Sequence, residues 1–455
     1  MLRNCLSSIF KSSYSKSKFE VIVVDNNSHD GSCAFIKKNF PKVTIIRLKE
    51  NVGFAMGNNE GYKHARGEYI ALLNNDTEVD KNWLTELVAV AQDSRVGIVA
   101  SKILLQVPFV EVSITSSVVQ QSDLDQSTNF SPRGVLIEDI SCPNSDCRDL
   151  IWYSTGFDKQ KVLSGVGLRW TTGKATVLLP ILEEKNTFSF VFHGYPSNDS
   201  QLPMNAKVSV KNKELCHFSL SPNSVFNKKI TINKSTCADN LVWLVQNAGN
   251  LLLKDGYSKD IGSVTRILGG SVEEFYEPDS QFFSQERKLV SACGAGMLIK
   301  REVIEKIGFF NQHYFMYYED IDFCLRVWKH GWDIVFAPKA IMHHTHRATT
   351  GKTESSFFIS MIEKNHLFLL LTHFSLSTFL QEYFLFGCRL FDAILKQFVF
   401  RFKHWDKYQI WKIKASGRLD AFISFHKKIF TFIKIRYWWK SREVRNYNQL
   451  KHHLY

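Results

Sequence analysis

The sequence predicts an α/β fold in which one domain is interrupted by an inserted antiparallel β-sandwich and followed by a helical C-terminal tail. Three observations predict this organisation. Continuous apolar runs alternate with helical patterns over residues 1–104, short alternating runs replace them over 105–241, and the first pattern returns over 242–356. The length of 455 residues allows two or three domains.

The first part of the α/β domain, residues 1–104, alternates buried strands with helices. Continuous β-branched runs separated by helices are typical of a parallel sheet that is covered on both faces. The predicted strands are Phe19–Val24, Val43–Leu48, Glu68–Leu73 and Val96–Leu104. The predicted helices are Ser32–Asn39, Ala55–Ala65 and Asp80–Ala91. Such a sheet favours nucleotide binding at the carboxyl ends of its strands.

The inserted part, residues 105–241, has no helical periodicity. Prolines and Asn/Ser clusters separate its alternating runs, a pattern typical of an antiparallel β-sandwich. The predicted strands include Ala175–Leu179, Thr187–Phe192, Lys207–Val210 and Lys229–Ile232. Insertions of this kind are tolerated at surface loops.

The second part of the α/β domain, residues 242–356, begins after the insertion. A Cys-Gly-Ala-Gly segment at 293–296 leads into a strand, and helices are predicted at Arg301–Ile307 and Glu319–Lys329. A strand at Asp333–Ala337 precedes a histidine-rich loop.

Two carboxylates, Asp25 and Asp76, directly follow predicted strands of the parallel sheet. Because the carboxyl ends of parallel strands lie at one edge, both side chains are expected there. Asp76 ends an Asn-Asn-Asp triplet that resembles a degenerate DxD sequence, and carboxylate oxygens are the ligands that Mg²⁺ prefers. The alternative is that both residues only cap the turns that follow. Gly53 belongs to a Gly/Asn-rich loop that could approach a nucleotide, and a tight turn is its alternative interpretation.

The second part places Glu319, Asp320 and Asp322 at the start of a helix. A carboxylate at the mouth of a pocket can act as a general base, whereas Asp322 is expected to pair with Arg326 at i+4. The loop that follows the last strand contains His343, His344 and His346, which are candidate ligands for a metal or a diphosphate, or simply exposed loop residues.

Three segments together resemble the family 2 inverting glycosyltransferases with a GT-A fold, in particular the rhamnosyltransferase-like branch. They are VIVVDNNSHDGS at 21–32, NVGFAMGNNEGYKHARGEYIALLNNDTEV at 51–79 and CGAGMLIKREVIEKIGFFNQHYFMYYEDIDFCLRVWKHGWDIVFAPKAIMHH at 293–344. The resemblance covers about 1–104 and 242–370. It implies a GT-A nucleotide-diphospho-sugar transferase domain.

The resemblance also implies roles for matched positions. Asp320, with Glu319 beside it, would be the base that deprotonates the acceptor. Asp76 would hold a divalent cation, Mg²⁺ or Mn²⁺, with His344 near the metal and the diphosphate; His343 and His346 are the alternates. The nucleotide-sugar would be bound by Asp25, Asn27, Gly53, Asn75, Gly294, Ala295 and Gly296.

The sequence departs from the family pattern in three places. The family's first strand has no counterpart before the helix that matches Leu2–Phe10, so the chain is expected to lack it. The β-rich insertion is not part of the minimal fold, and Arg169–Gly173 with the strands after it resembles accessory β-sandwich modules of bacterial polysaccharide glycosyltransferases. No QxxRW sequence occurs, so a processive synthase is disfavoured.

The net charge of +13 is concentrated in the tail. Residues 357–455 contain 17 Lys+Arg and 6 Asp+Glu, a surplus of 11, together with 24 aromatic residues. Stretches such as Phe422–Trp439 are predicted to be basic amphipathic helices that bind an anionic membrane surface. A helical appendage packed on the α/β domain is the alternative. A nucleic-acid partner is not expected, because no reader motif accompanies the basic residues.

Cysteine usage and hydropathy suggest a location. An odd number of nine cysteines without a signal peptide favours a reducing compartment, and only Cys142 and Cys147 lie close together. The longest uncharged stretch, Asn365–Gln381, is short and polar for a membrane span. We expect a cytoplasmic protein that is peripheral at the inner face of the cell membrane.

The sequence therefore predicts an inverting, non-processive glycosyltransferase. Its donor would be a nucleotide-diphospho-sugar, and its acceptor a hydroxyl of a cell-surface polysaccharide or a lipid-linked glycan. The alternative is a non-catalytic carbohydrate-binding protein with a truncated, inactive transferase domain.

Overall fold

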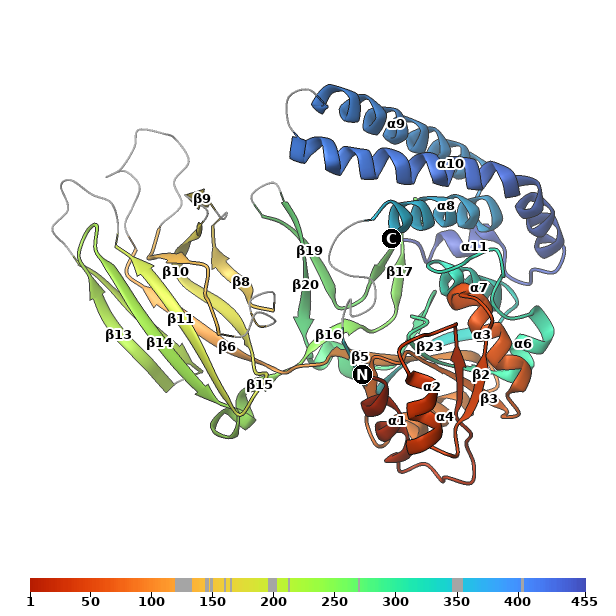
Figure 1. Cartoon of the computed structure of the whole chain (residues 1–455), viewed down its shortest axis with the longest axis horizontal. Coiled ribbons are helices and arrows are strands. Elements are labelled where there is room, and N and C mark those ends of the chain that lie inside the picture. The colour runs from red at the N-terminus through yellow and green to blue at the C-terminus, as the bar shows by residue number, and fades with distance from the viewer. Residues whose placement is uncertain are drawn as a thin grey trace. The chain divides into compact units, whose positions relative to one another are not determined.

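The computed structural model describes residues 1–118, 133–143, 147, 150–158, 161–163, 166–194, 203–211, 213–268, 271–345, 355–401 and 405–455 (Figure 1). The chain forms two compact units. The first unit comprises Met1–Gln106, Gln246–Ile261 and Ser280–Tyr455, and the second comprises Val107–Val245 and Gly262–Asp279. Residues 262–279, which the sequence analysis assigned to the transferase domain, thus belong with the β-rich unit. A hairpin of β19 (Ser263–Leu268) and β20 (Ser271–Pro278) accounts for this, because β20 pairs with Leu244 and Val245 of that unit.

The first unit begins with a two-stranded parallel sheet. Strand β1 (Ile22–Asp25) pairs with β2 (Thr44–Arg47) in the register Ile22↔Thr44 to Asp25↔Arg47. Helices α1 (Leu2–Phe10) and α2 (Ser32–Asn39) pack beside it, with Leu6, Ile36 and Val43 buried between them. Within the described residues, β1 hydrogen-bonds to no other strand, and three of its four residues are only partly buried.

A larger sheet forms the core of the first unit. Strand β22 lies between β3 and β5 and is antiparallel to both, whereas β23 runs parallel to β5. All ten residues of β5 are buried. The strands are β3 (Tyr69–Leu73), β4 (Thr77–Val79), β5 (Val96–Leu105), β21 (Arg287–Leu289), β22 (Gly296–Lys300) and β23 (Asp333–His344). A short hairpin joins β17 (Asn250–Leu252) to β18 (Ser258–Asp260).

The predicted parallel sheet is confirmed in part: β1 pairs with β2 and β5 pairs with β23 in parallel, whereas β22 is antiparallel to its neighbours. Strand β22, which follows the insertion in the chain, lies between β3 and β5 and is antiparallel to both. Continuous apolar composition reports burial of both faces and carries no information on strand direction.

Helices beside this sheet confirm several predicted bounds. Helices predicted at Ser32–Asn39, Arg301–Ile307 and Glu319–Lys329 begin and end at those residues. Helix α4 buries Trp83 against β5, where its indole N–H donates to Ser101 Oγ at 2.8 Å. The helices are α3 (Gly53–His64), α4 (Trp83–Ala91), α6 (Arg301–Ile307) and α7 (Glu319–Lys329), with the 3-10 helix η3 (Gln281–Ser284).

The second unit consists of antiparallel strands in the order β13-β12-β6-β10-β7-β11-β14. The long strand β10 pairs with β7 near Leu168 and with β6 from Lys174 onward, so it is shared by two halves of the sheet. Its strands are β6 (Phe109–Ser116), β7 (Leu136–Glu138), β8 (Trp152–Phe157), β9 (Lys161–Leu163), β10 (Val166–Pro180), β11 (Lys185–His193), β12 (Met204–Val210), β13 (Lys213–Leu220), β14 (Val225–Asn233) and β15 (Leu241–Val242), with the 3-10 helix η2 (Ser235–Asn240). Strand β16 (Leu244–Asn247) instead belongs to the larger sheet, where it is the neighbour of β5.

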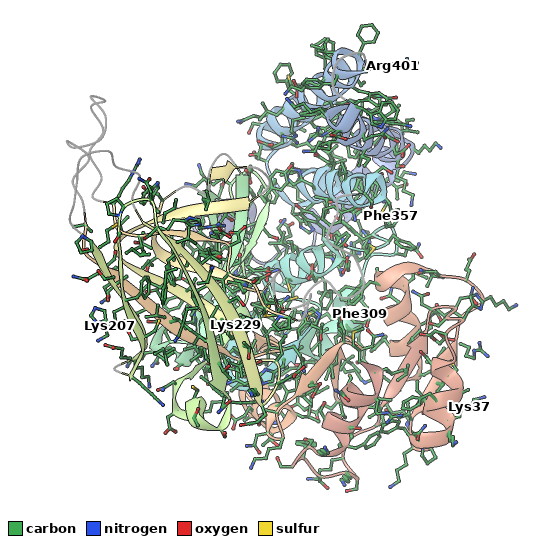
Figure 2. All side chains as sticks on the ribbon, turned by 60° about the vertical axis from the view of Figure 1, so that its left-hand side comes forward. Lys37, Lys207, Lys229, Phe309, Phe357 and Arg401 are labelled. Atoms are coloured by element: carbon green, nitrogen blue, oxygen red, sulfur yellow. A yellow bond between two sulfur atoms is a disulfide. The ribbon has the colours of Figure 1, made fainter. Side chains whose placement is uncertain are left out.

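Both halves of this sheet bury alternate residues in one core. Val110 and Val112 of β6 share it with Phe188 and Phe190 of β11. Polar residues take the other face, and Figure 2 labels two exposed examples, Lys207 on β12 and Lys229 on β14. Cys142 and Cys147 form a disulfide in this unit.

The tail is helical, as predicted for 357–455. Thirteen of the 18 residues of α8 are buried, so α8 belongs to the core of the first unit. Phe368 of α8 stacks on Phe432 of α10 at 3.7 Å between ring centroids. The helices are α8 (Ser356–His373), α9 (Leu376–Phe400), α10 (Trp405–Lys440) and α11 (Tyr447–Lys451). No helix in the described part of the chain is long and apolar enough to cross a bilayer.

Candidate functional site

Asp25 ends strand β1 and is buried. Its Oδ1 accepts a hydrogen bond from the backbone N–H of Ser28 at 2.9 Å. Its Oδ2 accepts from Cys33 Sγ at 3.0 Å and from Arg47 Nε at 3.3 Å. Burial acts to raise the pKa of Asp25, but these hydrogen bonds outweigh it and lower the pKa to about 2. Asp25 is therefore an ionised carboxylate with a fixed orientation, and it also caps the turn that follows.

Asn26, the next residue, connects β1 to the start of α3. Its Oδ1 accepts from the N–H of Val52 at 2.9 Å, and its Nδ2 donates to the carbonyl of Gly53 at 3.2 Å. Asn26 was not among the residues predicted from the sequence. Its position directly after a predicted strand was the available signal, because Asn readily bonds to nearby backbone.

Gly53 lies at the N-terminus of α3 with φ of +81°. A Cβ atom there would lie 2.7 Å from Cδ2 of Phe315 and would overlap the carbonyl oxygen of Phe315. That carbonyl accepts a hydrogen bond from the N–H of Phe54 at 2.7 Å. Gly53 was predicted to bind the nucleotide, but its nearest neighbour is thus Phe315 of the same chain.

Asn27 and Asn75 occupy turns at the ends of β1 and β3. Asn27 is partly exposed, with φ of 67°, a conformation that Asn adopts more readily than most residues. Asn75 is exposed. Both are accessible to a ligand at this edge of the fold.

Asp76 and His344 lie next to each other. Asp76 is 6% exposed, and its Oδ1 lies 3.2 Å from Nε2 of His344. The pairing of β4 with β23, in which His344 is opposite Thr77, brings them together. The N–H of Thr345 donates to the carbonyl of Asp76 at 3.1 Å.

The hydrogen bonds of this pair fit a cation site. Nδ1 of His344 is 3.0 Å from Oε1 of Gln246, so with Oε1 as acceptor Nδ1 carries the proton. Nε2 then presents a lone pair to Asp76 Oδ1, a buried oxygen that receives no hydrogen bond. Two facing lone pairs require a bridging cation or proton. In the described residues no three His, Cys, Asp or Glu side chains converge as metal ligands, so further oxygens would come from a diphosphate and water.

Asp320 is held by the segment that follows the insertion. Its Oδ2 accepts from the backbone N–H of Gly294 at 3.0 Å, and its Oδ1 accepts from the N–H of Ile321 at 2.8 Å. Burial raises the pKa of Asp320, although these hydrogen bonds act in the opposite direction. A carboxylate with a raised pKa accepts a proton more readily near neutral pH, which suits a general base.

Glu319 is buried beside Asp320, and its Oε2 has no hydrogen-bond partner. Burial, followed by the neighbouring charge of Asp320, raises its pKa well above the ordinary value of a glutamate. The two carboxylates thus have different environments: backbone N–H groups hold Asp320, whereas Glu319 Oε2 receives no hydrogen bond.

The 294–296 segment allows close packing. A Cβ at Gly294 would lie 3.3 Å from the ring of Phe54 and 3.4 Å from Cβ of Asp320. A Cβ at Gly296 would overlap Sδ of Met342. Ala295 is buried between them. The small size of these residues is therefore explained by close packing within the protein.

The backbone immediately before α7 is strained. Tyr317 and Tyr318 have φ of 67° and 69°, in the left-handed region that costs non-glycine residues energy. Nδ2 of Asn365, a residue of α8 with no exposed surface, donates to the carbonyls of Met316 and Tyr317, both at 2.8 Å. Strained backbone is found at functional sites when the surrounding structure holds it in place.

Asp322 has a structural role. It pairs with Arg326 at 2.9 Å, which confirms the predicted i,i+4 pair. His373 of α8 donates from Nε2 to the other oxygen of Asp322 at 2.9 Å. Burial acts to raise the pKa of Asp322, but Arg326 and His373 lower it overall.

The alternate His343 does not share the position of His344. Nδ1 of His343 lies 3.3 Å from the carbonyl of Leu105, on the side of β5, and burial lowers its pKa. His346 lies outside the described residues.

The candidate residues form a connected set. The N–H of Asn74 donates to the carbonyl of Ala295 at 3.1 Å, so the turn that carries Asp76 adjoins the 294–296 segment. Gly294 in turn donates to Asp320. The structure thus joins the candidate cation site to the candidate base through one backbone–backbone hydrogen bond and one hydrogen bond from a backbone N–H to the Asp320 carboxylate.

Two segments of the chain match known families. Residues 1–108 match the family described as "Glycosyl transferase family 2", and residues 262–399 match "Glycosyl transferase family group 2". Together they span just over half of the chain.

Curated relatives are similar over parts of their length. Glycosyltransferase AglE of Haloferax volcanii is 24% identical over 153 residues, which are 30% of this chain and 50% of that protein. The N-acetylglucosaminyl-diphospho-decaprenol L-rhamnosyltransferase of Mycobacterium tuberculosis is 32% identical over 84 residues, which are 18% of this chain and 27% of that protein. The chain therefore spans half or less of the length of these relatives.

Solved structures are similar at low sequence identity. The mannosyltransferase PcManGT from Pyrobaculum calidifontis, in complex with GDP-Man and Mn²⁺, has a TM-score of 0.37 and 11% identity over 93% of this chain and 82% of that chain. GalNAc-T7, with UDP, GalNAc and Mn²⁺, has a TM-score of 0.41 and 12% identity over 81% of this chain and 44% of that chain.

Proposed function

Because the chain belongs to glycosyltransferase family 2, we propose that it is an inverting, non-processive transferase. Its donor is a nucleotide-diphospho-sugar, and its acceptor is a hydroxyl of a cell-surface polysaccharide or a lipid-linked glycan. The observation that carries the proposal is the hydrogen bond from Gly294 to Asp320, because it fixes a carboxylate with raised pKa beside the segment that borders the sugar.

The donor occupies the edge formed by the ends of β1 and β3. Asp25 still has an unused lone-pair site on its carboxylate and accepts a hydroxyl or ring N–H of the nucleoside. Asn27 and Asn75, which are accessible in their turns, contact the nucleotide-sugar from the same edge. Gly53 acts indirectly, since it lets α3 approach the 311–318 segment.

Asp320 acts as the general base. It removes the proton of the acceptor hydroxyl while the oxygen attacks the anomeric carbon from the face opposite the diphosphate. Two backbone N–H groups keep its carboxylate oriented for that transfer. A single displacement of this kind inverts the anomeric configuration. Glu319, buried and unpaired, contacts no acceptor in this mechanism and affects the charge of its neighbour.

Asp76 and His344 would hold a divalent cation, Mg²⁺ or Mn²⁺. Their facing lone pairs and the lack of a donor to Asp76 Oδ1 support this assignment. Such a cation supplies charge neutralisation for a departing diphosphate. Gln246 fixes the proton of His344 on Nδ1 and thereby keeps Nε2 available.

The second unit is, in this proposal, an accessory β-sandwich. Two features support it: β10 is shared between two halves of the sheet, and both halves bury their side chains in one core. A strand that passes from one sheet to the other is a known way to make the corner of such a fold.

We place the enzyme in the cytoplasm, at the inner face of the cell membrane. The surplus of 11 positive charges in the tail supports an anionic surface as a partner. The compartment is testable through Cys142 and Cys147, which form a disulfide here. When cells are quenched in acid and the protein is then alkylated in denaturant, a reducing cytoplasm predicts nine reactive thiols, whereas seven would indicate an oxidising compartment.

Turnover of nucleotide-sugars tests the function. The full chain is incubated with a panel of UDP-, GDP- and dTDP-sugars and Mn²⁺ or Mg²⁺, and nucleotide release is measured. We expect turnover with at least one donor and a loss of about 100-fold or more in Asp320→Asn and Asp76→Ala. Asp420→Asn, on the exposed side of α10, is the matched control and should retain activity. A wild type that binds glycans without any turnover would instead establish a carbohydrate-binding protein.

A further inference from the structure

Helix α9 exposes an apolar face along its whole length. Its charged residues are buried or only partly exposed, and the residues that are exposed carry no charge. Nine of them are large apolar side chains: Leu376, Leu380, Phe384, Leu385, Phe391, Ile394, Leu395, Phe398 and Val399. At 100° per residue, positions 380, 384, 391, 395 and 398 fall within a narrow stripe on one side of the helix.

The opposite face of α9 packs against the rest of the first unit. Phe386 and Ala393 are buried, and Tyr383 Oη lies 3.0 Å from Nε2 of His426 on α10. Three of the four charged residues of α9 form ion pairs: Arg389 with Glu363, and Lys396 with Asp392. In Figure 1, α9 is the outermost of the three long tail helices, with α10 between it and α8. The exposed stripe is therefore additional to what folding requires.

Such a stripe is unusual for a surface in water. Contiguous exposed apolar patches commonly mark a protein or membrane interface. Helices that lie in the plane of a bilayer direct such an apolar face toward the acyl chains. The two occupants to distinguish are thus a lipid surface and a second copy of the chain.

Charge favours the lipid surface. The neighbouring helix α10 exposes lysines along its length: Lys407, Lys412, Lys427, Lys428, Lys434 and Lys440. A symmetric dimer through α9 would bring two tails, each with a surplus of 11 positive charges, against each other. An anionic bilayer complements this charge instead. Exposed Trp405, Tyr437 and Trp438 of α10 suit the boundary between headgroups and water.

We propose that α9 is the element that inserts into the membrane: its apolar stripe lies among the acyl chains of an anionic bilayer, and the lysines of α10 contact the headgroups. The segment predicted from the sequence for that role, Phe422–Trp439, is part of α10. This inference rests on the proposed function in one respect, since a lipid-linked acceptor makes attachment at a bilayer useful.

Cys388 provides a native probe of this face. It is an exposed cysteine on α9, whereas the other free cysteines are buried or partly buried. An environment-sensitive fluorophore on Cys388 of the full chain is mixed with vesicles of phosphatidylglycerol and phosphatidylcholine. We expect a blue shift and quenching by nitroxides placed on the acyl chains. A control with Cys388→Ser and Phe282→Cys, which moves the label to another exposed site, should show neither.

A double variant tests the energetic role of the stripe. Phe384→Ser with Phe391→Ser removes two rings that are 70% and 69% exposed, so the fold should be retained. Vesicle binding in co-flotation should fall about 10-fold or more, whereas Phe282→Ser should bind as the wild type does. Vesicle binding without a change at Cys388 would overturn the inference. So would a dimer, seen by ultracentrifugation without lipid, that the double variant abolishes.

The outcomes are separable from those of the proposed function. Nucleotide release from a soluble donor does not require lipid, so the double variant should retain it. A chain that inserts α9 without any turnover would support this inference and contradict the enzymatic proposal. A chain that shows turnover while its Cys388 probe stays in water would support the enzymatic proposal and contradict this inference.

Discussion

The side-chain amide of Asn365 donates a hydrogen bond to the carbonyl of Tyr317 at 2.8 Å. Tyr317 and Tyr318 are both left-handed, and they immediately precede the helix that begins with Glu319 and Asp320. The same amide nitrogen also bonds to the carbonyl of Met316. One buried side chain from the tail thus holds the backbone that presents the candidate base.

Asn365→Ala should weaken both folding and turnover. It removes the donor of two hydrogen bonds beneath a strained backbone, so we expect a loss of about 1–3 kcal/mol in the free energy of unfolding, measured in urea. We also expect kcat to fall while the KM for the donor changes little, because the donor side rests on other elements. Gln381→Ala, exposed on α9, is the control. Normal kcat in Asn365→Ala would refute this role.

Glu319→Gln should stabilise the protein in a pH-dependent way. The raised pKa of Glu319 means that the folded state binds its proton more tightly than the unfolded state does. The free-energy cost of ionising Glu319 in the folded state is therefore absent below the unfolded pKa of about 4.3. This cost grows as pH rises toward the folded pKa. At pH 8 we expect the variant to exceed the wild type by roughly 1–3 kcal/mol, and at pH 4 to match it.

Urea unfolding at several pH values measures this difference. Glu302→Gln, which changes an exposed carboxylate in the first turn of α6, should show no comparable trend. A constant stability difference between Glu319→Gln and the wild type at all pH values would contradict the explanation.

Gly53→Ala and Gly31→Ala form a matched pair. Both glycines have φ of +81°, but a Cβ at Gly31 meets nothing within 4 Å, whereas one at Gly53 overlaps Phe315. Gly31→Ala should therefore cost only the roughly 1–2 kcal/mol of a left-handed alanine. Gly53→Ala should cost about 1–3 kcal/mol more, from overpacking. Equal losses in thermal or urea unfolding would show that the approach of α3 to Phe315 is unimportant.

Gln246→Leu should lower the affinity for Mn²⁺. It removes the acceptor of His344 Nδ1 and so frees the ring and its tautomer. Loss of such a supporting hydrogen bond typically costs about 10–100-fold in metal affinity. Free Mn²⁺ is measured by electron paramagnetic resonance, with and without UDP. The exposed Gln92→Leu should bind as the wild type does; unchanged affinity in Gln246→Leu, together with lost binding in Asp76→Ala, would contradict the assignment.

Local features of the sequence predicted local structure well. The Asp322–Arg326 pair and the bounds of α2, α6 and α7 follow from spacing within one helix. Contacts across the fold could not be predicted in this way. Gln246 and His344 are 98 residues apart, and Asn365 and Tyr317 are 48 apart, so no periodicity connects them.

The order of strands in the main sheet could not be predicted from the sequence either. Strand β22 is separated from β5 in the chain by the insertion, and yet it lies between β3 and β5. The apolar pattern of each strand reported its burial, but pairing depends on which strands meet in space.

The 48-residue separation between Tyr317 and Asn365 has a consequence for synthesis of the protein. Chains grow at about 5–20 residues per second, and folding starts before release. The carboxylate edge that carries Asp25 and Asp76 precedes α8 by almost 300 residues. A nascent chain can therefore pair β1 with β2, and so place Asp25, well before the helix that steadies Asp320 has left the ribosome. Strands β3 and β4, on either side of Asp76, must wait for β22 and β23. Translation itself thus delays the completed site until the tail is made.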